Sequence, residues 1–171
     1  MWVVGMMGSG KTEAGRVAAK SLGVEFFDTD DVVAERMGCS IAQFWGERGE
    51  AAFREIEKVA TASLAVRAGV KATGGGVVLD ADNRNILTAS PKVVWLRAEP
   101  ETLAARIEGQ QDRPLLTSAG GSRVGLLKEM LDHRSSLYAE VASHQVNTER
   151  LDTAGVALAL EEIWRSGPSP V

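Results

Sequence analysis

Eight residues near the start of the chain, at 5–12, have the types and spacing needed to hold a triphosphate. Their sequence, GMMGSGKT, matches G-x-x-x-x-G-K-[ST] and lies between a short apolar run and a helical stretch. In such a loop, backbone N–H groups and a helix N-terminus converge on phosphate oxygens. Lys11 is expected to reach the β- and γ-phosphates of ATP, and Thr12 to ligate Mg²⁺. The cradle itself is expected from Gly8, Ser9 and Gly10. The alternative is a glycine-rich turn with a solvated lysine.

Two carboxylates follow the next apolar run, at Asp28 and Asp30. Because they are two residues apart, they could serve different partners. One could hold the water shell of a metal ion, while the other accepts a proton from an attacking hydroxyl. The alternative is that Asp30 caps a helix and Asp28 is solvated.

Three arginines could hold anionic groups. Arg54 lies on a predicted helix beside two carboxylates, Arg113 lies in a polar glycine-containing stretch, and Arg134 lies on a later helix. Considered singly, Arg54 is typical of a solvated charged face and Arg134 of an ordinary surface cation. The run Gly74–Gly76 is either an approach surface for a ligand or a flexible turn.

The elements that must position these residues alternate between strand-like and helical patterns, which predicts an α/β fold with a mostly parallel sheet. In such sheets ligands bind at the carboxyl ends of the strands. Gly5, Asp28 and Gly74 each follow a predicted strand directly, so their motifs should share one edge. Ser40 is expected to cap a short helix over 41–45. The predicted strands are 2–4, 24–27, 70–73, 92–96 and 145–147, and the predicted helices are 11–22, 31–67 with breaks at 38–40 and 46–49, 80–90, 99–108, 126–138 and 153–164.

Length and composition fit one globular domain over residues 1–171, with 44% apolar and 25% charged residues. The net charge of -4 argues against nucleic-acid binding, so anionic ligands must be held by a few cations in a cleft. Cys39 is the only cysteine, which excludes an intrachain disulfide, and two histidines do not suggest a His-rich metal site. No apolar run reaches the roughly 18 residues that span a bilayer, and Met1–Val4 lacks signal-peptide features. We therefore expect a cytoplasmic monomer without membrane partners.

Together, the motifs resemble the shikimate kinase family, relatives of the nucleoside monophosphate kinases. The likeness runs from Trp2 to about Thr148, with the phosphate loop, D-T-D, G-E-x-x-F-R-x-x-E, G-G-G, R-P-L-L and R-x-x-L-Y in the family's order and similar spacing. The resemblance implies a three-layer P-loop kinase fold, in which helices flank a five-stranded parallel sheet. It also implies a substrate-binding segment at about 29–66 and a lid loop at about 109–122. The implied reaction is ATP-dependent phosphorylation of a shikimate hydroxyl to give shikimate 3-phosphate.

The same resemblance implies a role for each site residue. Both substrate arginines would take the carboxylate of shikimate, since a guanidinium can grip a carboxylate in two-pronged fashion. Asp30 would orient and deprotonate the attacking hydroxyl. Thr12 is the implied ligand of Mg²⁺, and Asp28 would hold the ion through water. The implied catalytic residues are Lys11, Asp30 and the lid residue Arg113; the implied shikimate-binding residues are Asp30, Arg54, Gly75, Gly76 and Arg134; and Arg106 and Arg113 are the nucleotide contacts outside the phosphate loop, with Arg106 stacking on adenine.

Three positions depart from the family pattern. Trp45 replaces a frequent phenylalanine near the substrate, and Glu13 replaces a usual Ser or Thr. Arg150 lies one place early for a second adenine-contacting arginine, and the proline expected after it is absent. Two alternatives stay open: another small-molecule kinase of this fold, for gluconate or a nucleotide, and a catalytically silent nucleotide-binding relative. The two carboxylate-directed arginines and the triple glycine favour shikimate.

Overall fold

A five-stranded sheet organises the chain, of which the computed structural model describes residues 1–108 and 122–167. All strand pairs in the sheet are parallel, and the strand order is β2-β3-β1-β4-β5. The five-stranded parallel sheet expected from the sequence is therefore confirmed. The strands are β1 (Trp2–Val4), β2 (Phe26–Asp28), β3 (Val70–Ala72), β4 (Val93–Arg97) and β5 (His144–Asn147).

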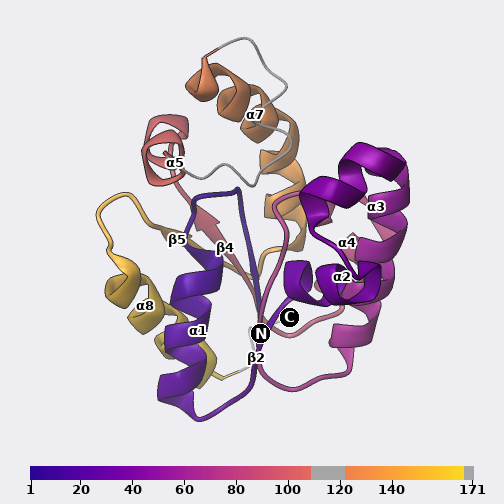
Figure 1. Cartoon of the computed structure of the whole chain (residues 1–171). Coiled ribbons are helices and arrows are strands. Elements are labelled where there is room, and N and C mark those ends of the chain that lie inside the picture. The colour runs from indigo at the N-terminus through magenta and orange to yellow at the C-terminus, as the bar shows by residue number, and fades with distance from the viewer. Residues whose placement is uncertain (109–121, 168–171) are drawn as a thin grey trace.

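Helices cover both faces of this sheet, which makes the three-layer arrangement (Figure 1). The α1 and α8 helices pack on one face, and α3, α4 and α7 contribute to the core on the other. Among the described residues, none of the helices combines the length and apolar character needed to span a membrane. The helices are α1 (Lys11–Leu22), α2 (Thr29–Met37), α3 (Ile41–Ala65), α4 (Ala81–Thr88), α5 (Pro100–Arg106), α7 (Arg123–Val141) and α8 (Thr153–Arg165), with a 3-10 turn η1 at Val77–Leu79.

The central strands are buried on both faces, as parallel strands between helical layers must be. In β1, Val3 faces the α1 and α8 side, whereas Trp2 and Val4 face the other layer. The same alternation continues in β4, where Val94 and Trp95 point to opposite layers. This two-sided core fixes the register of the strands, since a slip by one residue would exchange the faces.

Several element boundaries differ from the sequence predictions, and two of them bear on the elements around the site. Ser40 caps a helix as expected, with its Oγ accepting from Gln43 N at 3.2 Å, but that helix continues to Ala65. Gly49, with φ 78° and ψ 174°, leaves helical geometry and kinks this segment, so the predicted break at 46–49 is confirmed at Gly49, while the short helix extends beyond the predicted end at 45. The β2 strand starts two residues late because Val24 N is bound to Ala19 O in the C-terminal turn of α1.

Candidate active site

The carboxyl edge of the sheet carries a cavity of about 350 Å³ whose floor is the phosphate loop. The α1 helix begins there at Lys11, after Gly10 with φ 91°, and within 1–108 and 122–167 no side chain caps its first turn. The buried Ser9 Oγ has no hydrogen-bond partner among the described residues. Uncapped helical N–H groups and an unpaired hydroxyl suit an anion, as the loop sequence predicts. The cavity is lined by Gly8, Ser9, Gly10, Lys11, Thr12, Glu13, Ala14, Arg106, Leu151, Asp152, Thr153 and Val156.

The polar side chains of the loop bond to the loop backbone and to the D-T-D motif. Lys11 Nζ donates to Met6 O at 2.8 Å, and Thr12 Oγ1 donates to Asp28 Oδ2 at 2.7 Å. The other oxygen of Asp28 accepts from Asp30 N at 3.0 Å and so caps α2. The alternative interpretation of this motif is thus wrong, because Asp28 is the cap and is buried. Hydroxyl and carboxylate oxygens at this spacing are the hard ligands that Mg²⁺ prefers beside phosphates.

The triple glycine is packed tightly against both of these motifs and is not a flexible turn. Gly74 N donates to Thr29 Oγ1 at 2.9 Å. A Cβ on Gly74 would lie 2.8 Å from Asp30 Oδ1 and 2.9 Å from Glu57 Oε1. A Cβ on Gly75 would lie 3.3 Å from the backbone N of Met7 in the phosphate loop. The run therefore brings the backbone, Asp30 and α3 together at the carboxyl end of β3.

Arg54 points from α3 to this glycine run, where its guanidinium would overlap any side chain on Gly76. Nη1 donates to Glu57 Oε2 at 2.7 Å, and Nη2 donates to Glu50 Oε1 at 2.9 Å. The rings of Trp45 and Phe53 lie 5.6 and 5.2 Å from the guanidinium carbon. Arg54 is therefore not part of a solvated charged face.

The pKa values of both Glu57 and Arg54 are raised, which favours the neutral form of the acid and the charged form of the base. Glu57 is only 1% exposed, and burial raises the pKa of its carboxyl although the neighbouring Arg54 opposes the shift. Burial by itself would lower the pKa of Arg54, but its bonds to Glu57 and Glu50 outweigh burial and raise the pKa. The guanidinium is therefore a fixed positive charge that a buried carboxylate holds in place.

Arg134 approaches the same glycines from α7. It is 7% exposed, and its Nη1 donates to Gly75 O at 3.1 Å. The hydroxyl of Tyr138, one turn further on, donates to the same carbonyl, and burial raises the pKa of this phenol. Arg134 is also close enough to Glu57 to favour its ionised form. Both arginines thus converge on one corner beside the phosphate loop.

Arg106 borders the other end of the cavity, next to the segment that leads into α8. Its Nη1 donates to Thr148 Oγ1 at 2.9 Å and its Nη2 to Thr148 O at 2.6 Å. Glu149 fastens the same segment to the start of α5, accepting from Glu99 N at 2.7 Å and from Thr102 Oγ1 at 2.8 Å. Arg150 is exposed, so Leu151 lines the cavity instead. Arg113 and nearly all of the predicted lid, 109–122, lie outside the described residues.

Three buried positioning groups were not predicted from the sequence: Thr29, Glu57 and Tyr138. Glu57 has the clearest signal, because it lies three residues after Arg54 on a helix, a spacing that brings side chains together. Tyr138 follows Arg134 by four residues and shares its face of α7. Thr29 has no comparable signal, since its hydroxyl bonds a backbone N–H 45 residues away.

A parallel sheet of this order, with a phosphate loop after its central strand and a second cationic corner beside it, defines a P-loop kinase. Comparison with known proteins narrows the class. The family model described as "Shikimate kinase" matches residues 7–164. The chain belongs to the shikimate kinase family.

Relatives and solved structures agree with this membership. The chain is 40% identical over 165 residues to the shikimate kinase of Moorella thermoacetica, covering 96% of this chain and 93% of the relative. It is 41% identical over 164 residues to that of Symbiobacterium thermophilum, covering 94% and 92%. The structure of shikimate kinase from Acinetobacter baumannii in complex with shikimate matches with a TM-score of 0.90 at 34% identity, over 95% of this chain and 90% of that one. A gluconokinase from Sinorhizobium meliloti, at 19% identity and a TM-score of 0.59, shares the fold alone.

Proposed function

We propose that this protein transfers the γ-phosphoryl group of ATP to a hydroxyl of shikimate, giving shikimate 3-phosphate. The observation that carries the proposal is the convergence of Arg54 and Arg134 on Gly75 and Gly76, beside the phosphate loop. Shikimate has one carboxylate and three hydroxyls. Two guanidiniums fit its carboxylate, and the nearby Asp30 fits a hydroxyl.

On the side of the phosphoryl acceptor, the task of the protein is to position shikimate. Arg54 and Arg134 hold the carboxylate of shikimate, so that the ring lies against the glycine run. Asp30 then orients the attacking hydroxyl and accepts its proton as the bond to phosphorus forms. The packed glycines leave no side chain between the ring and the phosphate loop, so acceptor and donor can meet in line.

On the side of the phosphoryl donor, ATP, the task of the protein is to neutralise the charge of the phosphates. The phosphate loop binds the triphosphate of ATP, and Lys11 leaves Met6 O to balance charge on the β- and γ-phosphates. Thr12 would hold Mg²⁺ directly and Asp28 would hold it through water, since their oxygens lie 2.7 Å apart. The ion supplies further positive charge to the phosphates when bound. Arg106 binds beside the adenine, and Arg113 is proposed to close over the transferring phosphoryl group.

A shikimate titration followed by ADP release tests the function, with gluconate and a nucleoside monophosphate as competing acceptors. The parent should form ADP with shikimate only. Replacing the guanidinium by Arg54→Ala should raise KM for shikimate by roughly a hundredfold, as expected when a charge-assisted bidentate contact is lost, while nucleotide binding is retained. ADP formation that does not depend on shikimate, or that prefers another acceptor, would overturn the proposal.

A further inference from the structure

The cationic corner already contains a carboxylate that the proposed reaction does not use. Glu50 Oε1 accepts from both Nε and Nη2 of Arg54, at 3.3 and 2.9 Å. Glu50 is 52% exposed, whereas Glu57, the other carboxylate on Arg54, is 1% exposed. One partner of the arginine is thus fixed in the interior, and the other borders solvent.

Donors on all three nitrogens of the Arg54 guanidinium are engaged by the two glutamates. A two-pronged grip on another carboxylate needs a pair of adjacent N–H groups, and Glu50 holds the pair on the Nε side. Ionised Glu50 and Glu57 together also balance the charges of Arg54 and Arg134, which lie in the same corner. An incoming carboxylate therefore meets an occupied edge of Arg54 in a corner whose two positive charges are already compensated.

Glu50 has the freedom to leave that Glu57 lacks. It directly follows Gly49, the single residue where α3 departs from helical geometry, and its carboxylate can rehydrate without opening the core. We propose that Glu50 is an internal competitor for the substrate carboxylate: it occupies Arg54 until the substrate displaces it, and so weakens the binding of carboxylates that lack further contacts. The inference rests on the proposed function, in which Arg54 binds the carboxylate of shikimate.

If Glu50 competes with the substrate, its mutation should lower the KM for shikimate, whereas mutation of a group that positions Arg54 should raise it. If Glu50 competes, Glu50→Gln removes its charge and Glu50→Ala removes its hydrogen bond as well. The KM for shikimate should then fall in the order parent, Glu50→Gln, Glu50→Ala, by about two- to fivefold in total, the range expected for a partly exposed ion pair. The change should appear in KM rather than in kcat. Inhibition by benzoate, a carboxylate without hydroxyls, should strengthen in the same order.

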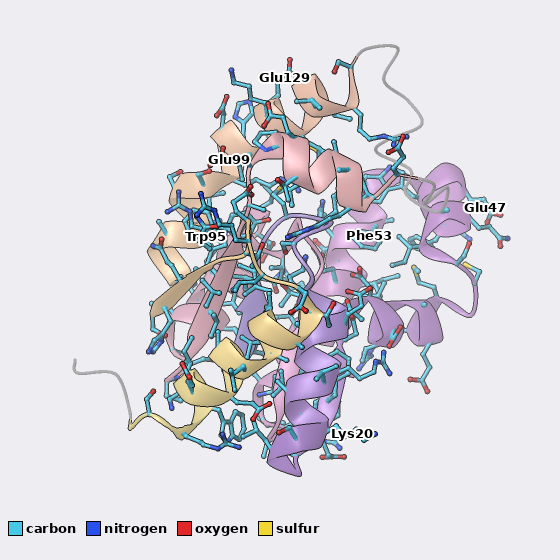
Figure 2. All side chains as sticks on the ribbon, turned by 90° about the vertical axis from the view of Figure 1, so that its left-hand side faces the viewer. Lys20, Glu47, Phe53, Trp95, Glu99 and Glu129 are labelled. Atoms are coloured by element: carbon cyan, nitrogen blue, oxygen red, sulfur yellow. The ribbon has the colours of Figure 1, made fainter. Side chains whose placement is uncertain are left out.

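Glu47→Gln is the matched control, because it removes one charge from the same helix, where Glu47 bonds Gln43 and lies on the outer side of the molecule (Figure 2). It should leave both constants near those of the parent, which separates competition at Arg54 from a general change in charge. A KM that stays constant or rises in Glu50→Ala, in a parent that phosphorylates shikimate, overturns this inference alone. A parent without shikimate-dependent ADP formation overturns the proposed function and the inference together.

Discussion

Residue 76 leaves no space for a side chain, because a Cβ there would overlap the guanidinium of Arg54. The backbone of Gly76, with φ −101°, is open to other residues, so the constraint is steric. The guanidinium of Arg54 would have to shift, and its ion pair with Glu57 at 2.7 Å opposes that shift. We expect Gly76→Ala to raise KM for shikimate by roughly ten- to hundredfold, as when a charged hydrogen bond is lost, with KM for ATP near that of the parent. A coupled ADP assay with each substrate varied in turn measures both constants.

Gly46→Ala is the control for that substitution, because a Cβ on Gly46 would meet no described atom within 4 Å. It replaces a helical glycine by a better helix former and should stabilise the protein by about 0.5–1 kcal/mol. Equal effects of the two substitutions on KM for shikimate would mean that the clash at residue 76 is not what positions Arg54.

Glu57→Gln tests the buried anchor of Arg54 without a change of shape. The amide keeps one acceptor for Nη1 but loses the charge that compensates the guanidinium in the interior. We expect KM for shikimate to rise by about tenfold or more, the reverse of the effect of Glu50→Gln. A fall in KM would show that Glu57, like Glu50, competes with the substrate. Circular dichroism of the variant checks that the fold is retained.

How far the sequence predicts the site depends on how local each contact is. The phosphate loop is one continuous segment with its own pattern, so Lys11 and Thr12 could be assigned directly. Arg54 and Arg134 are 80 positions apart, and only the resemblance to a family suggested that they act together. Spacing alone could not decide which of two nearby aspartates caps α2, because either side chain can reach a backbone N–H of the first turn.

At the scale of elements, the sequence predicted the alternation of strands and helices but not each boundary. The break predicted over 46–49 occurs at Gly49, whereas the helix continues through Gly46, because a single glycine costs a helix only about 1 kcal/mol and tertiary packing outweighs that. The same packing carries α7 beyond the predicted range, to Arg123–Val141. Helix existence follows from the apolar pattern, while the ends follow from contacts that the pattern does not contain.

Lys92, directly before β4, bonds the C-terminal end of α8. Its Nζ donates to Ile163 O at 2.6 Å, to Trp164 O at 2.8 Å and to Ser166 O. Lys92→Met keeps the apolar stem but removes these bonds and the cation at the negative end of the helix dipole. We expect it to lower the free energy of unfolding by about 1–3 kcal/mol in urea titrations.

The matched control for this element is Lys20→Met on α1, an exposed lysine in the last turn of its helix. It should change stability by less than about 0.5 kcal/mol, as surface substitutions usually do. Comparable losses in the two variants would show that Lys92 acts through charge alone and not through the helix end.

At the scale of the whole molecule, the parallel sheet explains why distant motifs form one site. The strand order places β1 beside β3, so the phosphate loop and the triple glycine leave neighbouring strands at the same edge. The D-T-D motif leaves β2, the next strand along. Arg54 and Arg134 enter from α3 and α7, which pack on the same face of the sheet. The donor and acceptor halves are therefore separate in sequence but adjacent in space.

Because the two substrates are expected to bind separate elements on one edge of the sheet, a mutation should remove the stabilisation of the fold by one substrate and keep that by the other. A ligand at 100 times its Kd adds about 2.7 kcal/mol to the stability of the folded state, which for a domain of this size raises Tm by roughly 5–10 °C. Shikimate and ATP with Mg²⁺ should each produce such a shift in the parent by differential scanning fluorimetry. Arg54→Ala should lose the shift with shikimate and keep the shift with ATP, because Thr12 of the phosphate loop bonds Asp28, whereas Arg54 bonds Glu50 and Glu57 within its own helix. Chelation of Mg²⁺ should reduce only the ATP shift, since Thr12 and Asp28 lie on the donor side. Loss of both shifts in Arg54→Ala would mean that the ATP site depends on the shikimate site, and the proposed separation of the two sites would be wrong.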